Sequence, residues 1–437
     1  MTLRGEAVLV LGLGRSGQAA ARLAASAGAS VTALDLREDL PPIPGVRMRL
    51  GPHPRQAFLD ASLIVVSPGV PSDQPDLLAA AQAGVPVVGE VGFAARFVNA
   101  PMVGITGTNG KSTVTHFVGH LLGGEQEGVF VGGNFGTPLS EAALATPPRR
   151  CVVELSSYQL ERPGALRLRA SAILNLTDDH LNRHGTMEAY AQAKCTILGH
   201  TDPDGVALIP GDDPFLQGIA EAQESPSLSF LGRAPGCWRE GEVGVVTLPG
   251  VEARFDLSAL TLAGAHNLDH AVTAATLALS MGESVEAIQA RLPGLTALPH
   301  RMEPVGQLGG ALWINDSKAT NLASARVGIG GLDRPAVVLL GGQAKGPGFD
   351  ALADVLDGQR AVVGFGHAGP QIASELGAVG VSVRVVPSLE DAMALASRLV
   401  RPGDAVLLSP ATASFDAFRS FEHRGDVFRA WVRGGGA

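Results

Sequence analysis

Hydrophobic positions in the first ninety residues form short apolar runs separated by glycine turns and one alanine-rich stretch. The run AVLVL ends at Leu11, and a glycine turn leads into the alanine-rich stretch. A second run, SVTALD, ends at Asp35. This order predicts a strand, a tight turn, a helix and a second strand. The later runs SLIVV and VPVV predict two further strands, and we expect this unit to close near Phe93.

The same alternation starts again at Met102, where MVGIT precedes a glycine-rich loop and a helical stretch. Two further apolar runs follow. CVVEL carries Glu154, and SAILN ends near Asn175, just before Asp178, Asp179 and His180. Because the carboxyl ends of parallel strands share one edge of a sheet, these polar residues are expected to converge at that edge.

Five apolar runs in the last part of the chain (ALWIN, AVVLL, AVVGF, VSVRVV and AVLL) alternate with helical stretches such as LEDAMALASRLV. Pro293 and Pro299 punctuate the segment before them and indicate a boundary. The sequence therefore predicts an α/β protein of three domains: a Rossmann-like domain over residues 1–93, a central P-loop-type ATPase domain over 94–297, and a Rossmann-like, doubly wound domain over 298–437.

Composition supports several folded domains and argues against some partners. The chain has 437 residues, of which 46% are hydrophobic and 17% charged, so its cores can be large and disorder is not indicated. A formal charge of -9 opposes non-specific attraction to nucleic acid. Three scattered cysteines suit a reducing cytoplasm. The apolar opening is too short for a signal or membrane segment, so no membrane insertion is expected.

The first glycine turn has the spacing G-x-G-x-x-G at Gly12, Gly14 and Gly17. Such glycines let the backbone approach a diphosphate, and the following helix N-terminus attracts its negative charge. Asp35 stands where a carboxylate could accept hydrogen bonds from a nucleotide sugar or from an N–H of its base. The pattern also occurs in turns that bind nothing and in nicotinamide-dependent oxidoreductases, so both interpretations remain open.

The second glycine loop, GTNGKST, is more specific. Backbone N–H groups around Gly107 and Gly110 would surround phosphate oxygens, Lys111 supplies a positive charge, and the Ser112 hydroxyl can bind Mg²⁺. Ile105 stands where the strict pattern G-x-x-x-x-G-K-[ST] has its first glycine, so the loop is a variant.

Glu154 and His180 are candidates for a metal site downstream of this loop. A single carboxylate at a strand end is more often a cap or an ion-pair partner than a ligand. Several polar groups at the same sheet edge make both interpretations about equally plausible from the residues alone.

The segments GITGTNGKSTVT, ELSSYQLE, LNLTDDHLNRHG, GAHN, LPHRME, WINDSKATN and SPATASFDAFRSFEHRG occur in this order and span most of the chain. As a set, they resemble the Mur ligases of peptidoglycan synthesis. NDSKATN, the closing SPATAS segment and the first domain favour the branch that adds D-glutamate. The resemblance implies ATP-dependent joining of D-glutamate to UDP-N-acetylmuramoyl-L-alanine (UDP-MurNAc-L-Ala) through an acyl phosphate, with release of ADP and phosphate.

The resemblance also assigns residues to ligands. For the UDP-sugar it implies Gly14, Arg15, Ser16, Asp35, Arg37, Gly69 and Asn134. Family members often carry a hydroxyl residue where Leu36 stands here. For ATP it implies Gly107, Thr108, Asn109, Gly110, Lys111, Ser112, Thr113, Asn267, Arg301, Asp316 and Lys318, with His270 where the closest relatives tend to have asparagine. For D-glutamate it implies Thr320, Lys345, Ser414 and Phe421.

Two Mg²⁺ sites are part of what the resemblance implies, the first held by Ser112 and Glu154 and the second with help from His180. Lys194 matches a lysine that this family carboxylates, and the resulting carbamate would offer Mg²⁺ an anionic oxygen ligand. Taken alone, a single helical lysine would be interpreted as a solvated surface charge. Lys111, His180, Lys194 and Asn134 are the residues expected to act in catalysis.

Three alternatives remain beside this expectation. A nicotinamide-dependent oxidoreductase would use the first glycine turn but leaves GTNGKST unexplained. A nucleotide-binding regulator without turnover would not need so many apparent active-site residues. A folylpolyglutamate synthase would share the ATP site but would not need a UDP-binding first domain. The expected ligands are small molecules and Mg²⁺, and the chain is expected to act as a monomer.

Overall fold

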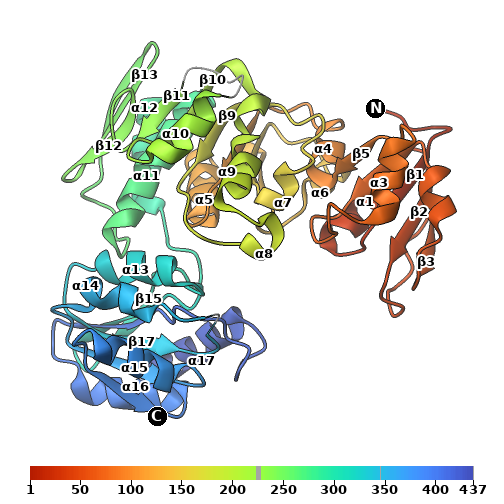
Figure 1. Cartoon of the computed structure of the whole chain (residues 1–437). Helices are drawn as coiled ribbons and strands as arrows, with labels where there is room; N and C mark the ends of the chain where they lie inside the picture. The colour runs from red at the N-terminus through yellow and green to blue at the C-terminus, as the bar shows by residue number, and fades with distance from the viewer. Residues whose placement is uncertain (223–227, 345, 437) are drawn as a thin grey trace. The chain divides into compact units, whose positions relative to one another are not determined.

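The computed structural model describes residues 1–222, 228–344 and 346–436. Its contacts divide the chain into two compact units, Met1–Ser258 with Ala271–Leu292 and Ala259–His270 with Pro293–Ala437. The first unit contains two β-sheets and the second contains one (Figure 1). The three sheets correspond to the three α/β domains that the sequence predicts.

The first sheet is parallel throughout, with the order β3-β2-β1-β4-β5. Its strands are β1 Ala7–Leu11, β2 Ser30–Asp35, β3 Val46–Leu50, β4 Leu63–Val66 and β5 Val87–Gly89, and its helices are α1 Arg15–Ser26, α2 Arg55–Leu59, α3 Pro75–Gln82 and α4 Glu90–Ala95. The predicted strand, turn, helix and strand are confirmed. The sequence analysis missed the edge strand β3, because VRMRL is only half-buried and lacks a continuous apolar run.

Close packing explains one glycine of the first turn. A Cβ on Gly17 would stand 1.8 Å from the carbonyl oxygen of Gly12, so any larger residue would push α1 away from the turn. The turn therefore depends on glycine for its packing, whether or not a ligand is bound.

The second sheet has nine strands in the order β14-β13-β12-β11-β10-β9-β6-β8-β7. They are β6 Met102–Thr106, β7 Val129–Gly133, β8 Arg150–Glu154, β9 Leu168–Ile173, β10 Thr201–Pro210, β11 Leu228–Leu231, β12 Gly236–Glu240, β13 Val243–Leu248 and β14 Val251–Asp256. Neighbouring strands pair in parallel along the sheet from β12 through β11, β10, β9, β6 and β8 to β7. Strands β13 and β14 form an antiparallel extension beside β12. This extension, green in Figure 1, is a feature that the sequence analysis did not predict.

Short helices accompany the second sheet: α5 Lys111–Leu121, α6 Leu139–Leu144, α7 Ser157–Leu160, α8 Leu181–His184, α9 Met187–Cys195, α10 Pro214–Glu221, α12 Val285–Arg291, and the 3₁₀ turns η1 Glu125–Glu127 and η2 Leu198–His200. Helix α11 (Ala265–Ser280) belongs to the second unit up to His270 and to the first unit from Ala271 on. The 3₁₀ turn η3 (Leu292–Gly294) follows α12.

The third sheet has the order β15-β16-β20-β17-β18-β19, with β15 antiparallel to β16 and the other pairs parallel. Its strands are β15 Glu303–Leu308, β16 Ala311–Asn315, β17 Ala336–Gly341, β18 Ala361–Phe365, β19 Val383–Val386 and β20 Ala405–Leu408. The five predicted strands are confirmed. The added edge strand β15, EPVGQL, is half-exposed and contains proline and glycine, so it has no apolar run to reveal it.

The helices of this domain are α13 Leu322–Gly330, α14 Ala353–Leu356, α15 Gly369–Ala378, α16 Leu389–Leu399 and α17 Phe421–Arg433, with the 3₁₀ turn η4 Phe349–Leu352. Alternate residues of β17 enter two different hydrophobic clusters. Val338 and Leu340 belong to one cluster and Val337 and Leu339 to the other. Both faces of the sheet are therefore covered, as expected of a doubly wound fold.

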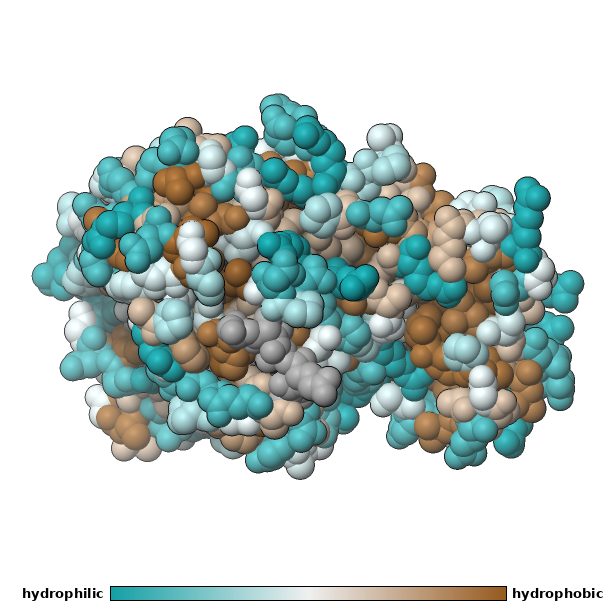
Figure 2. Space-filling view, turned by 90° about the horizontal axis from the view of Figure 1, so that it is seen from above, coloured by the Kyte–Doolittle hydropathy of each residue, from teal (hydrophilic) through white to brown (hydrophobic). Residues whose placement is uncertain are grey.

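The visible surface mixes polar and apolar residues, with a more extended hydrophobic area on the first domain, at the right of Figure 2. Single exposed apolar residues are common on folded proteins, and Leu36, Leu59 and Leu78 are examples in this domain. Within the described ranges, the helices are too short or too polar to cross a bilayer.

Candidate active site

The loop between β6 and α5 closes around its own lysine. Gly110 precedes α5 with a φ of 80°, a left-handed conformation that glycine adopts without steric cost. The ammonium group of Lys111 donates hydrogen bonds to the carbonyl oxygens of Gly107 (3.0 Å) and Thr108 (2.7 Å). Ile105, which departs from the strict phosphate-loop pattern, lies inside β6 with its side chain fully buried. The predicted strand, loop and helix are therefore present. The residue that departs from the pattern, Ile105, packs in the hydrophobic core.

Asn175, just after β9, holds this loop from the neighbouring strand. Its carbonyl oxygen accepts from the N–H of Thr108 at 3.0 Å, and its side-chain oxygen accepts from the N–H of Asn109 at 2.8 Å. The Thr108 hydroxyl also lies 3.2 Å from the hydroxyl of Tyr190. The sequence analysis gave neither Asn175 nor Tyr190 a role, although the position of Asn175 at a strand end was visible there.

Glu154 links the phosphate loop to a second loop of the middle domain. The hydroxyl of Ser112 donates to Oε2 of Glu154 at 2.5 Å, and the amide of Asn134 donates to Oε1 at 2.7 Å. Glu154 and Ser112 are 2% and 4% exposed. Two buried oxygen donors in contact beside a phosphate loop fit the coordination preference of Mg²⁺.

Lys194 is buried against the phosphate loop and is 1% exposed. Its ammonium group donates to the Gly107 carbonyl at 2.7 Å and lies 4.5 Å from the centre of the Tyr190 ring. Burial, with a smaller contribution from Lys111, lowers the pKa of Lys194 well below its ordinary value. The interpretation of Lys194 as a solvated surface charge is therefore wrong.

His180 belongs to a tightly folded segment before α8 and has a φ of 56°. Its Nδ1 lies 3.1 Å from the hydroxyl of Tyr158, and its Nε2 lies 3.6 Å from Asp179. Arg183, within α8, forms a two-point ion pair with Glu161. In the part of the chain that the structure describes, no three His, Cys, Asp or Glu side chains converge into a metal-binding group.

A cavity of about 690 Å³ opens at the carboxyl ends of the first sheet's strands. The expected UDP-sugar residues Gly14, Arg15, Ser16, Asp35, Gly69 and Asn134 line it. Asn134 comes from the middle domain, so this cavity and the Glu154 site share one residue. The lining also includes Leu36 and His53, and the sequence analysis had not singled out His53.

Arg37 contributes to this cavity indirectly, because it holds the carboxylate of Asp35. Its backbone N–H and Nε donate to Oδ1 at 2.9 and 3.0 Å, and Nη2 donates to Oδ2 at 3.0 Å. The N–H of Leu13 donates to Oδ2 at 2.6 Å. These hydrogen bonds hold the pKa of Asp35 well below its usual range, and the bond from the Arg37 side chain contributes most. Asp35 is thus an anionic anchor for the glycine turn.

The third domain gathers polar residues after β16. Asp316 is buried, and its oxygens accept from the Ser409 hydroxyl (2.8 Å) and the Met302 N–H (3.2 Å). Burial raises the pKa of Asp316 to about 7. The ammonium group of Lys318 lies 4.1 Å from the ring centre of Phe421. The expected ATP-contacting and D-glutamate-contacting residues Lys318 and Phe421 therefore adjoin each other.

Two other expected D-glutamate residues lie in the same domain. The N–H of Thr320 donates to the carbonyl of Lys318 at 2.8 Å, and Ser414 is buried. The fourth, Lys345, lies outside the described residues.

Asn267 and Arg301, two further expected nucleotide residues, belong to the second unit together with His270. The amide of Asn267 donates to the carbonyl of Ala263 at 2.7 Å. Burial lowers the pKa of His270 to about 3, with smaller contributions from His266 and Arg301. His270 is thus a neutral imidazole beside Arg301 at neutral pH, and it can accept or donate a hydrogen bond without charge.

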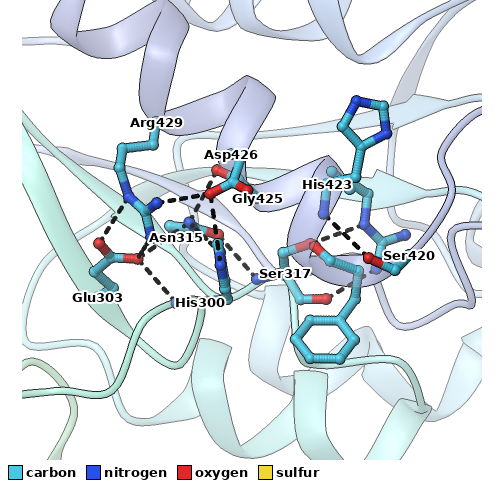
Figure 3. Close-up of polar contacts among 11 residues, drawn as sticks. His300, Glu303, Asn315, Ser317, Ser420, His423, Gly425, Asp426 and Arg429 are labelled. Carbon is cyan, nitrogen blue, oxygen red and sulfur yellow. Dashed lines mark hydrogen bonds and ion pairs between the residues drawn. The ribbon is translucent and has the colours of Figure 1, made fainter.

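A polar network that the sequence did not reveal supports this part of the third domain (Figure 3). The amide of Asn315 contacts Nδ1 of His300 at 3.0 Å and donates to the carbonyl of Gly425 at 3.1 Å. Glu303 accepts two hydrogen bonds from Arg429 and one from the N–H of His300. The network connects the segment that carries Arg301 with α17, so it fixes the start of the third domain.

Three family models match successive parts of the chain. They are described as "Mur ligase MurD-like, N-terminal domain" (residues 6–89), "Mur ligase middle domain" (105–278) and "Mur ligase, glutamate ligase domain" (300–412). Their order agrees with the order of the three sheets.

Relatives of known name are similar over the whole chain. A UDP-N-acetylmuramoylalanine–D-glutamate ligase of Anaeromyxobacter dehalogenans is 42% identical and covers 98% of this chain and 97% of its own length. One of Myxococcus xanthus is 40% identical and covers 99% of both chains. One of Geobacter metallireducens is 38% identical, covering 99% of this chain and 98% of its own.

Solved structures support the fold. MurF from Acinetobacter baumannii gives a TM-score of 0.63 at 19% identity, covering 98% of this chain and 92% of its own. UDP-N-acetylmuramate–alanine ligase from Thermotoga maritima gives 0.59 at 17% identity, covering 98% and 99%. At these identities, the comparison establishes the shared three-domain architecture and nothing finer.

Proposed function

The chain belongs to the Mur ligase family, and from this premise we propose that it joins D-glutamate to UDP-MurNAc-L-Ala at the expense of ATP. The observation that carries the proposal is the phosphate loop that closes around Lys111 and whose Ser112 contacts the buried carboxylate of Glu154. Family membership also removes the oxidoreductase and the regulator without turnover as explanations.

We assign the UDP-sugar to the first domain, residues 1–93. The first turn of α1, with Arg15 and Ser16, offers free N–H groups and a positive side chain to a diphosphate. Asn134 lies at the end of the cavity that adjoins Glu154. A substrate that fills the cavity can therefore direct its muramoyl-alanine carboxylate toward the phosphate loop.

We assign ATP to the loop of residues 107–113 in the middle domain, 94–297, with further contacts from Asn267, Arg301, Asp316 and Lys318. Ser112 and Glu154 would hold one Mg²⁺, and His180 and a carbamate on Lys194 would contribute to a second. Bound Mg²⁺ supplies positive charge that stabilises the phosphate oxygens during transfer. Lys111 supplies further positive charge from the protein itself.

The reaction follows from the poor reactivity of a free carboxylate. A carboxylate oxygen of UDP-MurNAc-L-Ala attacks the γ-phosphorus of ATP, the bond to the β-phosphate oxygen breaks, and ADP leaves. The neutral amine of D-glutamate then attacks the acyl carbon, a proton is lost from nitrogen, and phosphate leaves as the amide forms. The chain's part is to orient the reactants and stabilise the transferring charge through Lys111.

We assign D-glutamate to the third domain, residues 298–437. Thr320, Lys345, Ser414 and Phe421 are the proposed contacts. The support is that Thr320 and Phe421 both adjoin Lys318 after β16. A cationic side chain in this position suits the two carboxylates of D-glutamate.

We propose that Lys194 acts as a carbamate. As an ammonium group it would be a buried cation beside Lys111 and could not bind a metal ion. Reaction of its amine with CO₂ would replace that cation with an anionic oxygen donor. The burial of Lys194 against the phosphate loop supports this assignment.

We further propose that the protein is a monomer and acts in the cytoplasm. Cys151, Cys195 and Cys237 are buried thiols, which suits a reducing compartment where ATP is available.

The test is ADP formation by the purified protein with ATP, Mg²⁺, UDP-MurNAc-L-Ala and each of several amino acids. We expect turnover with D-glutamate, and none when either building block is omitted. Lys111→Ala should lower kcat by at least about a thousandfold, because positive charge on the transferring phosphate is lost. ADP formation that does not depend on D-glutamate would overturn the proposal.

A further inference from the structure

His53 lines the cavity of the first domain, but no role has been assigned to it so far. It follows β3, and its ring packs 6.4 Å from that of Phe58, which belongs to a hydrophobic cluster. Its Nδ1 is buried and has no hydrogen-bond partner among the described residues. A buried ring nitrogen without an acceptor favours placing the proton on the other nitrogen, Nε2. The ring therefore has an N–H to offer the cavity.

The sheet order places His53 at one end of the cavity. Strand β3 neighbours β2, which ends at Asp35, and β2 separates β3 from β1 and the glycine turn. If the diphosphate lies at the first turn of α1, then a nucleotide base lies beyond β2, as in other folds of this type. His53 is thus at the end where the base is expected.

Other groups at this end offer little to the edge of a base. Asp35 already accepts four hydrogen bonds, from Leu13 and Arg37, which matches the capacity of a carboxylate. Leu36 is 72% exposed and has no polar side-chain atom. Neither Asp35 nor Leu36 can donate a hydrogen bond to the base, and Arg37 does not line the cavity. His53 lines it and has a donor.

We propose that His53 is a specificity-determining residue that donates a hydrogen bond from Nε2 to O4 of uracil. The inference rests on the proposed function, in which this cavity takes a UDP-sugar. At the same position cytosine carries an amino group, which is itself a donor. An N–H of His53 would face that donor without an acceptor, so the interaction selects uracil over cytosine.

The test is calorimetric titration of the full chain with UDP and with CDP. The wild type is expected to bind UDP at least about tenfold more tightly than CDP. His53→Phe keeps an aromatic ring beside Phe58 but removes the N–H. It should weaken UDP binding by about three- to tenfold and leave CDP binding nearly unchanged. His53→Gln, whose amide can donate, should stay within about threefold of the wild type.

Two results would overturn the role of His53. One is an equal weakening of UDP binding and CDP binding in His53→Phe, which would indicate altered packing. The other is an equal loss of UDP affinity in His53→Phe and His53→Gln, which would show that the hydrogen bond is not the cause of the loss. His367→Phe, at an exposed position of the other unit, is the matched control and should bind as the wild type does. If the wild type binds no UDP at all, the assignment of this cavity fails as well, and that outcome is separate from the first two.

Discussion

The hydroxyl of Ser112 and the carboxylate of Glu154 share a 2.5 Å hydrogen bond that joins the phosphate loop to the end of β8. Because both are oxygen ligands suited to Mg²⁺, we expect Ser112→Ala and Glu154→Gln to raise the Mg²⁺ concentration for half-maximal ADP formation by at least about tenfold. Titration of activity with Mg²⁺ at saturating ATP measures this.

Ser112→Thr is the matched control, since it keeps a hydroxyl at the same position. It should require nearly the wild-type Mg²⁺ concentration. If Ser112→Ala and Ser112→Thr needed the same Mg²⁺ concentration, the hydroxyl would not be a ligand.

Lys194 offers a second test, because its proposed carbamate can be replaced by a free carboxylate. Lys194→Ala should lower kcat by at least about a hundredfold, as loss of a metal-site contact does. Formate or acetate should restore part of the activity by occupying the space that the side chain leaves. Lys111→Ala should not be rescued, because its role needs positive charge. Rescue of both variants, or of neither, would contradict the assignment.

The sequence revealed those parts of the molecule whose pattern is local. The strand, loop and helix around Lys111 were predictable because glycines, a lysine and flanking apolar runs stand together. Strand β14 was not, since only Ala253 and Phe255 of VEARFD are buried, and β13 was overlooked although its VGVV is an apolar run.

Contacts between distant residues were the main omission at the candidate site. The four hydrogen bonds that occupy Asp35 come partly from Leu13, twenty-two residues away, and no pattern encodes such a pairing. The burial of Lys194 was likewise invisible, because a lysine in a short helix usually faces solvent. The resemblance to a family identified Lys194, but the structure supplies the physical reason for its special position.

Arg424 tests how the third domain is held together. Its side chain is fully buried and donates to the Ser317 hydroxyl and to four carbonyl oxygens, those of Ser317, Gly341, Thr412 and Ala413. Burial lowers its pKa to about 10. Arg424→Met should leave several buried acceptors without donors and lower the free energy of unfolding by about 3 kcal/mol or more. Urea denaturation followed by tryptophan fluorescence measures this.

Arg429 lies on the same helix and provides a control. Its ion pair with Glu303 is less buried than the contacts of Arg424, and its partner Asp426 is exposed, so Arg429→Met should cost less, about 1–2 kcal/mol. Equal losses for Arg424→Met and Arg429→Met would show that the fully buried hydrogen bonds of Arg424 contribute no more than the partly solvated ion pairs of Arg429.

Glu90 should make the stability of the first unit depend on pH. It is 1% exposed, and one carboxylate oxygen accepts from the N–H of Ser140 at 2.7 Å, in the first turn of α6. The other oxygen is buried without a hydrogen-bond partner among the described residues. Burial raises the pKa of Glu90 above its ordinary value of 4.5, opposed by the Ser140 hydrogen bonds and assisted by nearby Glu141.

A carboxyl group with a raised pKa binds its proton more tightly in the folded state. Below about pH 4.5, Glu90 is protonated in both states and its ionisation does not lower the free energy of unfolding. As the pH rises from there toward the folded pKa, ionisation of Glu90 lowers the free energy of unfolding progressively. Glu90→Gln keeps an acceptor for Ser140 but cannot ionise. Its urea midpoint should exceed that of the wild type at pH 8, and the difference should shrink toward pH 4. Glu90→Ala, which removes the acceptor, should be less stable by about 1–3 kcal/mol at both pH values. Parallel pH profiles for Glu90→Gln and the wild type would mean that ionisation of Glu90 does not affect folding.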